Sequence, residues 1–168
     1  MGSGGVTVSE PGVRGEVCMR GPNVTRGYWN RPEATAAAFD EAGWFHTGDV
    51  GQFDEDGIIS IVDRVKDMVI SGGENVYPAE VESVLFGHPS VAEVAVIGLP
   101  DARWGEAVTA VVAAKPGQSV TLEDLREYAA SHLARFKLPQ RLHLVEVLPR
   151  NPTGKVLKYQ LREDLGAK

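Results

Sequence analysis

The sequence predicts an α+β fold in two parts, a β-rich part over residues 1–64 and a compact α+β part over residues 65–168. Three observations support this prediction. The first part holds short β-branched and aromatic runs separated by glycine turns, which is typical of strands. In the second part, segments with helical spacing alternate with strongly apolar runs. The first part also has only about 60 residues, a size at which an independent core is marginal.

The elements of the first part follow from local residue chemistry. Residues 1–5, MGSGG, resemble a cloning remnant or a floppy end and are left out of the fold. The acid-glycine sequence at 54–57 indicates a hairpin turn. The other expected elements are a strand at 15–21, a helix from Pro32 to about Phe39, a turn at 40–43, an extended segment at 45–50 and a strand at 58–62.

Residues 63–82, DRVKDMVISGGENVYPAEVE, combine a strand, a glycine turn and a helix start. A buried strand is predicted for the apolar residues Val65, Met68, Val69 and Ile70. The following Ser71-Gly72-Gly73 predicts a turn, because glycine readily adopts positive φ. Pro78 keeps Tyr77 extended and suits the first turn of a helix, so a helix is expected from about Ala79.

The rest of the second part reads as alternating helices and strands. Thr121 opens a helix, and Asp124 three residues later predicts a capping box. The buried face of that helix is marked by Leu122, Leu125, Ala129 and Leu133. Trp104 is expected in the core. The other expected elements are a helix at 79–86, strands at 91–98, 107–114 and 141–147, and a last short helix at 156–165.

Composition excludes several classes of protein. The net charge of −6, without a basic helix or zinc-finger spacing, argues against nucleic-acid binding. There is no apolar run near the roughly 20 residues of a membrane span and no signal segment, so we expect a cytoplasmic protein. The single Cys18 cannot form an internal disulfide, and the four histidines show no ligand spacing with it or with one another. No metal site is therefore expected.

Three features have residue types suited to a phosphate-bearing ligand. Asp49, between two glycines, could accept two hydroxyl hydrogen bonds from a ribose, although an Asx turn is the alternative. Gly72 and Gly73 leave room for a slender chain beside the backbone. Lys155 lies in the loop Pro-Thr-Gly-Lys, which could present a mobile cation or simply a solvated lysine. In addition, residues 135–168 are basic, with eight lysines and arginines against three acidic residues, which suits a phosphate-bearing ligand, although a solvated charged face is the alternative.

Four motifs agree in order and spacing with one family. They are residues 43–51 (GWFHTGDVG), 57–63, 71–78 and 151–155 (NPTGK). From about Gly15 to about Leu165 the chain resembles the adenylate-forming enzymes, which include acyl-CoA synthetases, peptide-synthetase adenylation domains and beetle luciferases. The resemblance implies that residues 1–64 are the tail of a large amino-terminal domain. Residues 65–168 would then be its carboxy-terminal lid domain, which changes position between two half-reactions.

The resemblance also assigns roles to residues. It implies that Asp49 binds the ATP ribose, assisted by Arg64, and that Lys155 catalyses adenylation. Lys66 stands where relatives have an Asp or Lys hinge, although an ordinary surface lysine is the alternative. The segment GGENVYPAEVE is similar to acyl-CoA synthetases, which implies a CoA tunnel lined by Ile70, Ser71, Gly72, Gly73 and Glu74.

The implied parent reaction converts a carboxylic or fatty acid, ATP and CoA into acyl-CoA, AMP and pyrophosphate, with Mg²⁺. The family's phosphate loop and substrate pocket belong to the amino-terminal domain and are not in this sequence. We therefore expect the chain to be inactive alone and to bind no cofactor tightly, with the missing domain as its partner and a homo-oligomer as a possible state. Two alternatives stay open: a lid module that acts in trans, or a related adenylation domain with an acceptor other than CoA.

Overall fold

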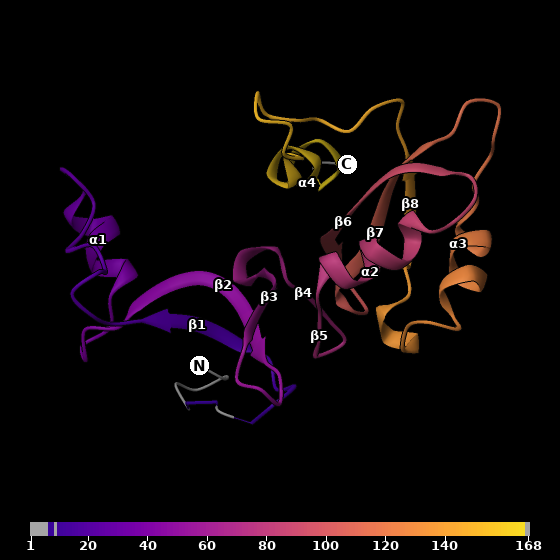
Figure 1. The fold of residues 1–168 in the computed structure, drawn as a ribbon. Helices are drawn as coiled ribbons and strands as arrows, with labels where there is room; N and C mark the ends of the chain where they lie inside the picture. Colours follow the sequence, from indigo (N-terminus) through magenta and orange to yellow (C-terminus); the bar gives the residue numbers. More distant parts are fainter. Residues whose placement is uncertain (1–6, 9, 167–168) are drawn as a thin grey trace. The chain divides into compact units, whose positions relative to one another are not determined.

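The computed structural model describes residues 7, 8 and 10–166, so the expectation for residues 1–5 lies outside the described residues. The chain divides into two compact units, one ending at Lys66 and one beginning at Asp67 (Figure 1). Both units combine helices with mainly antiparallel sheets, so the α+β class is confirmed. In the part of the chain that the structure describes, no helix has the length and apolarity to cross a membrane.

The first unit is built on a three-stranded antiparallel sheet. Its strands β1 (Gly15–Met19), β2 (Phe45–Phe53) and β3 (Ile59–Arg64) lie in the order β1-β2-β3. Helix α1 (Pro32–Ala38) begins at the expected proline. The expected hairpin turn joins β2 to β3, where Asp54 Oδ1 accepts a hydrogen bond from the Ile58 N–H over 2.8 Å and Gly57 has φ 76°. The local turn chemistry therefore sets the β2–β3 hairpin.

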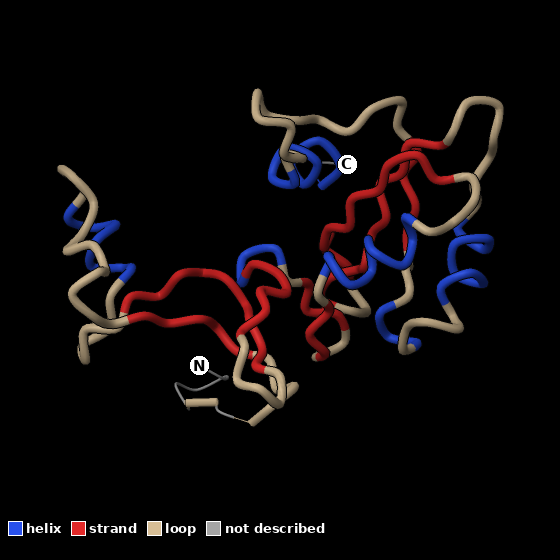
Figure 2. The backbone as a smooth tube through the Cα atoms, viewed as in Figure 1, coloured by secondary structure: helices blue, strands red, loops and turns tan. Residues whose placement is uncertain are grey.

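The second unit is a five-stranded sheet with helices on both faces (Figures 1 and 2). Its strands are β4 (Val69–Ser71), β5 (Glu74–Val76), β6 (Val91–Asp101), β7 (Gly105–Ala114) and β8 (Arg141–Leu144). Their order is β5-β4-β7-β6, and β8 pairs with β7 in parallel. The helices are α2 (Pro78–Phe86), α3 (Leu122–Ala129) and α4 (Lys158–Gly166), and a short 3₁₀ turn lies at Arg135–Lys137. Another short 3₁₀ turn, Val65–Asp67, includes the last residues of the first unit and the first of the second.

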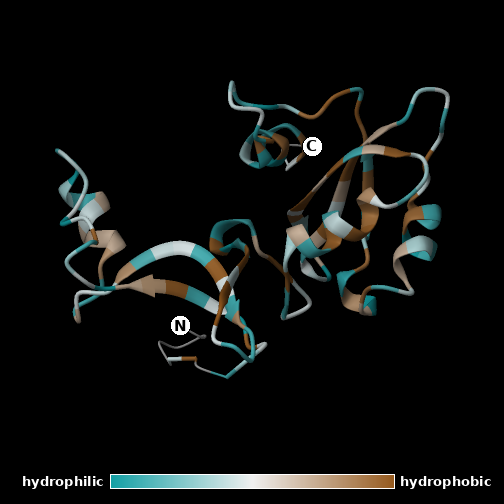
Figure 3. Ribbon diagram, viewed as in Figure 1, coloured by the Kyte–Doolittle hydropathy of each residue, from teal (hydrophilic) through white to brown (hydrophobic). Residues whose placement is uncertain are grey.

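Alternation along β6 and β7 divides the core of the second unit into two clusters. One cluster contains Val96, Val108, Ala110 and Val112 and packs against buried residues of α2 and α3. The other contains Ala95, Ile97, Leu99 and Val111 and packs against Leu161 of α4. Because successive side chains of a strand point to opposite faces, both faces of these strands must be apolar. The hydropathy colouring accordingly shows brown along β6 and β7 (Figure 3).

Several expected elements were correct in type but wrong in extent. The predicted buried strand from Val65 to Ile70 is wrong, because Val65 lies in a 3₁₀ turn and, of the four apolar residues, only Val69 is buried. The Ile70 side chain is 51% exposed, since β4 alternates between core and solvent. Strand β6 runs on through Pro100, which is tolerated because β6 is an edge strand.

The carboxy-terminal elements show smaller differences. The predicted strand at 141–147 ends at Leu144, and the last helix begins at Lys158 instead of 156, because Val156 pairs with Arg150 in an isolated bridge. The predicted capping box at Thr121 and Asp124 is confirmed, with both reciprocal hydrogen bonds formed. Leu125 and Ala129 are buried as expected, and the buried Leu133 lies beyond the end of α3.

Candidate functional site

Asp49 and Arg64 face each other on neighbouring strands of the first unit. They are cross-strand partners in the β2–β3 ladder, and Arg64 Nε donates a hydrogen bond to Asp49 Oδ1 over 3.1 Å. Both side chains keep contact with solvent, at 36% exposure for Asp49 and 41% for Arg64. The second carboxylate oxygen and the outer guanidinium nitrogens can therefore reach a ligand. The structure brings together the two residues that the sequence analysis assigned to a nucleotide.

Hydrogen bonds fix the backbone at Asp49. Its N–H donates to Thr47 Oγ1 over 3.1 Å, and Thr47 Oγ1 in turn donates to the carbonyl of Val17 in β1 over 2.7 Å. Gly48 between them has φ 72°, a conformation that costs little only for glycine. The Thr-Gly-Asp sequence thus bends β2 locally and holds the carboxylate on a sheet instead of on a flexible loop.

Lys66 is exposed in the 3₁₀ turn Val65–Asp67, at the end of the first unit. The next residue is already fastened to the second unit, because Asp67 Oδ1 accepts a hydrogen bond from Arg162 of α4 over 3.0 Å. A solvated residue directly before a fixed one is a suitable position for a backbone rotation.

The five residues expected to line a CoA tunnel form the β4–β5 hairpin, and they divide into two groups. Ile70, Gly72, Gly73 and Glu74 are exposed. Ser71 is only 3% exposed and its hydroxyl accepts a hydrogen bond from Gln140 over 3.2 Å, because β4 lies between β5 and β7. The Ser71 side chain therefore points into the second unit, and only the main chain of Ser71 could contribute to a CoA tunnel.

Trp104 lies against this hairpin, and its expected place in the core is wrong. The residue is 38% exposed, and its ring stacks on Arg103, with the guanidinium carbon 4.7 Å from the ring centroid. A Cβ atom at Gly72 would lie 3.1 Å from the indole, and the Gly72 N–H donates to the Trp104 carbonyl over 2.8 Å. This contact is not visible in the sequence, because the pairing of β4 with β7 creates it.

Lys155 is exposed at the end of a tight turn held by Asn151. The Asn151 side-chain oxygen accepts hydrogen bonds from the N–H groups of Lys155 (2.8 Å) and Thr153 (3.1 Å) and from the Thr153 hydroxyl (2.8 Å). The Asn151 N–H donates to the Lys155 carbonyl over 2.9 Å. Gly154 has φ 86°, and Arg150 donates to its carbonyl over 2.6 Å. The turn is thus rigid at its base and presents the lysine outward.

The side chain of Lys155 differs from that of its neighbour Lys158. The Lys158 ammonium forms an ion pair with Glu82 of α2 over 2.7 Å and is mostly buried. Among the described residues, the Lys155 ammonium has no ion-pair partner. Lys155 is therefore available to an anionic ligand, whereas Lys158 fastens α4 to α2.

A second polar cluster lies in the first unit, where sequence spacing gave no signal. Cys18 and His46 are cross-strand partners in the β1–β2 ladder, with Cys18 Sγ 3.6 Å from His46 Nδ1. Glu16 Oε2 lies 2.8 Å from the same ring nitrogen. Desolvation by burial raises the pKa of the Cys18 thiol above its usual value. Only strand register reveals this cluster, since 28 residues separate the cysteine from the histidine.

Residues 80–155 match the AMP-binding enzyme C-terminal domain family. The chain is 55% identical over 153 residues to a long-chain-fatty-acid–CoA ligase of Mycobacterium tuberculosis, covering 91% of this chain and 30% of that protein. It is 51% identical to a fatty acid–[acyl-carrier-protein] ligase of Streptomyces coeruleorubidus, over 91% of this chain and 29% of the relative. Among solved structures, the ATP-bound MatB of Rhodopseudomonas palustris is similar with a TM-score of 0.85 and 45% identity, over 93% of this chain and 31% of that one. The chain thus spans about 30% of the length of its relatives.

Proposed function

Because this chain belongs to the adenylate-forming enzyme family and corresponds to its carboxy-terminal portion, we propose that it is part of an ATP-dependent acyl-CoA ligase. In the first half-reaction, a carboxylate oxygen attacks the α-phosphorus of ATP, and the bond to pyrophosphate breaks. In the second, the CoA sulfur attacks the acyl carbon, and AMP leaves. The carboxylate carbon of the acid thus becomes the carbonyl carbon of the thioester in acyl-CoA.

Lys155 serves the first half-reaction in this proposal. The attacking carboxylate is negative, and negative charge builds up on the α-phosphate oxygens and the leaving pyrophosphate, so one ammonium nearby stabilises the transition state. The observation that carries the proposal is the geometry of this residue, an exposed ammonium on a turn whose backbone Asn151 and Arg150 hold in place. The turn fixes the backbone of Lys155, and the long side chain lets its ammonium extend to a ligand.

Asp49 and Arg64 hold the nucleotide in this proposal. The Asp49 carboxylate would accept hydrogen bonds from the two ribose hydroxyls, which are strong because the acceptor is charged. Arg64, bonded to Asp49 over 3.1 Å, keeps that carboxylate oriented and contributes a positive charge near the phosphates.

The β4–β5 hairpin serves the second half-reaction. Gly72 and Gly73 expose main-chain groups without side chains, so a pantetheine arm can run beside them. Lys66 would act as the hinge on which the lid changes position between the two half-reactions. Ile70 and Glu74 would flank the arm, one with apolar surface and one with a carboxylate.

The first unit is proposed to be a piece of a larger domain. Val50 is the one buried apolar side chain in its described part, whereas Ile59 and Ile61 of β3 are more than 40% exposed. Such a small core supports the need for a larger partner that covers the sheet. The phosphate loop that would hold ATP and Mg²⁺ is not in this sequence, so we propose that the chain alone is inactive.

A chimera tests the proposed function. In it, this chain replaces the matching carboxy-terminal part of the M. tuberculosis ligase, with which it shares 55% identity. With a long-chain fatty acid, ATP, Mg²⁺ and CoA, the chimera should release AMP and form acyl-CoA, whereas the chain alone should do neither. Acyl-adenylate formation by the isolated chain, or a folded chimera that binds ATP without releasing pyrophosphate, would contradict the proposal.

A second candidate function is acyl transfer to a carrier protein, which the similarity to the Streptomyces ligase favours. An acceptor competition between CoA and a carrier protein with a phosphopantetheine arm distinguishes the two. Preferential loading of the carrier protein by the chimera would replace CoA as the proposed acceptor.

A further inference from the structure

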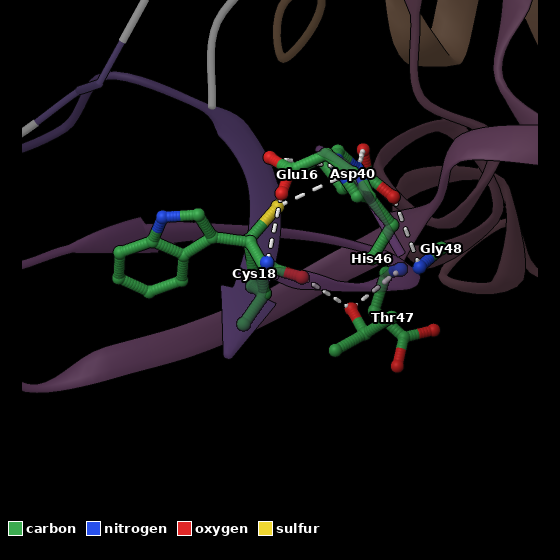
Figure 4. Close-up of polar contacts among 9 residues, drawn as sticks. Glu16, Cys18, Asp40, His46, Thr47 and Gly48 are labelled. Atoms are coloured by element: carbon green, nitrogen blue, oxygen red, sulfur yellow. Dashed lines mark hydrogen bonds and ion pairs between the residues drawn. The ribbon is translucent and has the colours of Figure 1, made fainter. Parts of the chain in front are cut away.

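We propose that Glu16, Cys18 and His46 form a binding site for a divalent transition-metal ion of the zinc class, on the first unit. The three residues offer a carboxylate oxygen, a sulfur and a ring nitrogen that all lie within 4.8 Å of one another. All three come from the adjacent strands β1 and β2, and they gather at one place on the sheet (Figure 4). The proposal is independent of the proposed ligase function.

The spacing of the ligand atoms suits a tetrahedral ion. With Zn–S near 2.3 Å and Zn–N near 2.05 Å at the tetrahedral angle, the sulfur and nitrogen ligands lie about 3.6 Å apart. Cys18 Sγ and His46 Nδ1 are 3.6 Å apart. Glu16 Oε2 is now at a hydrogen-bond distance of 2.8 Å from Nδ1 and would move outward by about 0.6 Å to reach the ligand spacing.

The donor set selects the class of metal. Calcium and magnesium prefer all-oxygen sites, whereas a thiolate with an imidazole favours zinc and its neighbours. Three protein ligands leave one coordination position for water. The side chains of Glu16 and His46 are 24% and 31% exposed, so an ion can enter from solvent.

The surrounding groups lie where a metal site would use them. Glu16 Oε1 accepts a hydrogen bond from the Gly48 N–H over 3.1 Å, which leaves Oε2 directed at the histidine. His46 Nε2 lies 3.8 Å from Asp40 Oδ2, and Asp40 Oδ1 is fixed by the Trp44 N–H over 2.8 Å. Metal-bound histidines usually donate a hydrogen bond from their second nitrogen to a carboxylate, and Asp40 Oδ2 would have to approach Nε2 by about 0.6 Å or more to accept one.

The competing explanation is an ion pair between Glu16 and His46, with Cys18 as an ordinary strand residue beside it. With His46 protonated, the same explanation also accounts for Asp40, whose Oδ2 lies 3.8 Å from His46 Nε2, but it gives no role to the Cys18 sulfur 3.6 Å from Nδ1. Both carboxylates and the thiol are accounted for if an ion sits at Nδ1 and Asp40 holds Nε2.

Metal titration of the full chain tests the proposal. Zn²⁺ should bind with one-to-one stoichiometry, and Co²⁺ should give the charge-transfer absorption of a cobalt–thiolate bond. Cys18→Ser should abolish that absorption and weaken Zn²⁺ binding by more than about 100-fold, and Asp40→Asn should weaken it by about 10- to 100-fold. His143→Gln, which alters a histidine of β8 in the second unit, should bind Zn²⁺ like the wild type.

Alkylation of the wild-type chain keeps the test decisive if a variant fails to fold. Saturating Zn²⁺ should slow the reaction of Cys18 with iodoacetamide by at least about 10-fold, because a metal-bound sulfur is no longer a free nucleophile. Equal alkylation rates with and without Zn²⁺, or equal Zn²⁺ affinity for Cys18→Ser and the wild type, would show an ion pair only and overturn the proposal.

Discussion

The side-chain oxygen of Asn151 accepts a hydrogen bond from the backbone N–H of Lys155 over 2.8 Å. A turn residue four positions earlier therefore fixes the position of the Lys155 backbone. The same oxygen also accepts two hydrogen bonds from Thr153. A short polar side chain that bonds to the following backbone in this way replaces a turn of main-chain hydrogen bonds. Asn151 is therefore a positioning residue for Lys155.

Asn151→Ala removes all three of these hydrogen bonds and should leave the Lys155 turn loose. In the chimera, we expect the rate of adenylation to fall by about 10- to 100-fold, because small misplacements of a catalytic group are costly. Thioester formation from supplied acyl-adenylate should be unchanged. Asn151→Asp, which retains an acceptor at the same place, should recover most of the adenylation rate, and failure to recover it would argue against the positioning role.

Asp49→Ala should weaken ATP binding. A hydrogen bond to a charged group contributes about 1.5–3 kcal/mol, so the KM for ATP should rise by about 10- to 100-fold while the KM for CoA is unchanged. Asp56→Asn, an exposed acid in the β2–β3 turn, is the matched control and should leave both values unaltered. An unchanged KM for ATP in Asp49→Ala would remove Asp49 from the nucleotide site.

Alanine variants of Gly72 and Gly73 distinguish two effects of adding a side chain to the β4–β5 turn, namely backbone strain and steric contact with Trp104. Both have positive φ, at 62° and 86°, so alanine at either position should cost about 1–2 kcal/mol in the free energy of unfolding. Gly72→Ala should cost more, because its Cβ would lie 3.1 Å from the Trp104 ring, whereas Gly73 has open space. Urea unfolding of the two variants measures the difference in their free energies of unfolding. Equal free energies would contradict a steric clash between the added Cβ and Trp104.

Asp101 should contribute to stability in a pH-dependent way. Hydrogen bonds from the N–H groups of Arg103 and Trp104, together with Arg141, lower the pKa of its carboxyl. A depressed pKa in the folded state means that the contribution is present above the unfolded value near pH 4 and is lost as pH falls through the folded value. Asp101→Asn should therefore show a smaller loss of stability between neutral pH and pH 3 than the wild type does, as measured by thermal unfolding.

The elements that depend on nearby residues were predictable from the sequence. Three of these elements involve only residues within a few positions of one another. They are the capping box at Thr121 and Asp124, the acid-glycine hairpin turn at 54–57 and the helix start at Pro78. For the same reason, the Asn151–Lys155 turn was visible as a turn. Its hydrogen-bond pattern was not, because several geometries suit the same residues.

The features that depend on strand pairing were not predictable. Ser71 is buried because β4 lies between two other strands, and Trp104 contacts Gly72 because Gly105 pairs with Ser71. Cys18 and His46 meet through the register of β1 and β2. The spacing of residues along the sequence does not determine the register between strands that are distant in the chain. Sequence spacing therefore gives no sign of this cluster.

The most direct test of the central claim is the effect of Lys155→Ala on the two half-reactions of the chimera, with Lys115→Ala as an exposed-lysine control. We expect adenylation, followed as pyrophosphate release, to fall by about 10²- to 10³-fold, while thioester formation from supplied acyl-adenylate and the Lys115→Ala variant stay near the wild-type rate. Loss of thioester formation with adenylation intact would contradict the account, as would an unchanged rate of pyrophosphate release.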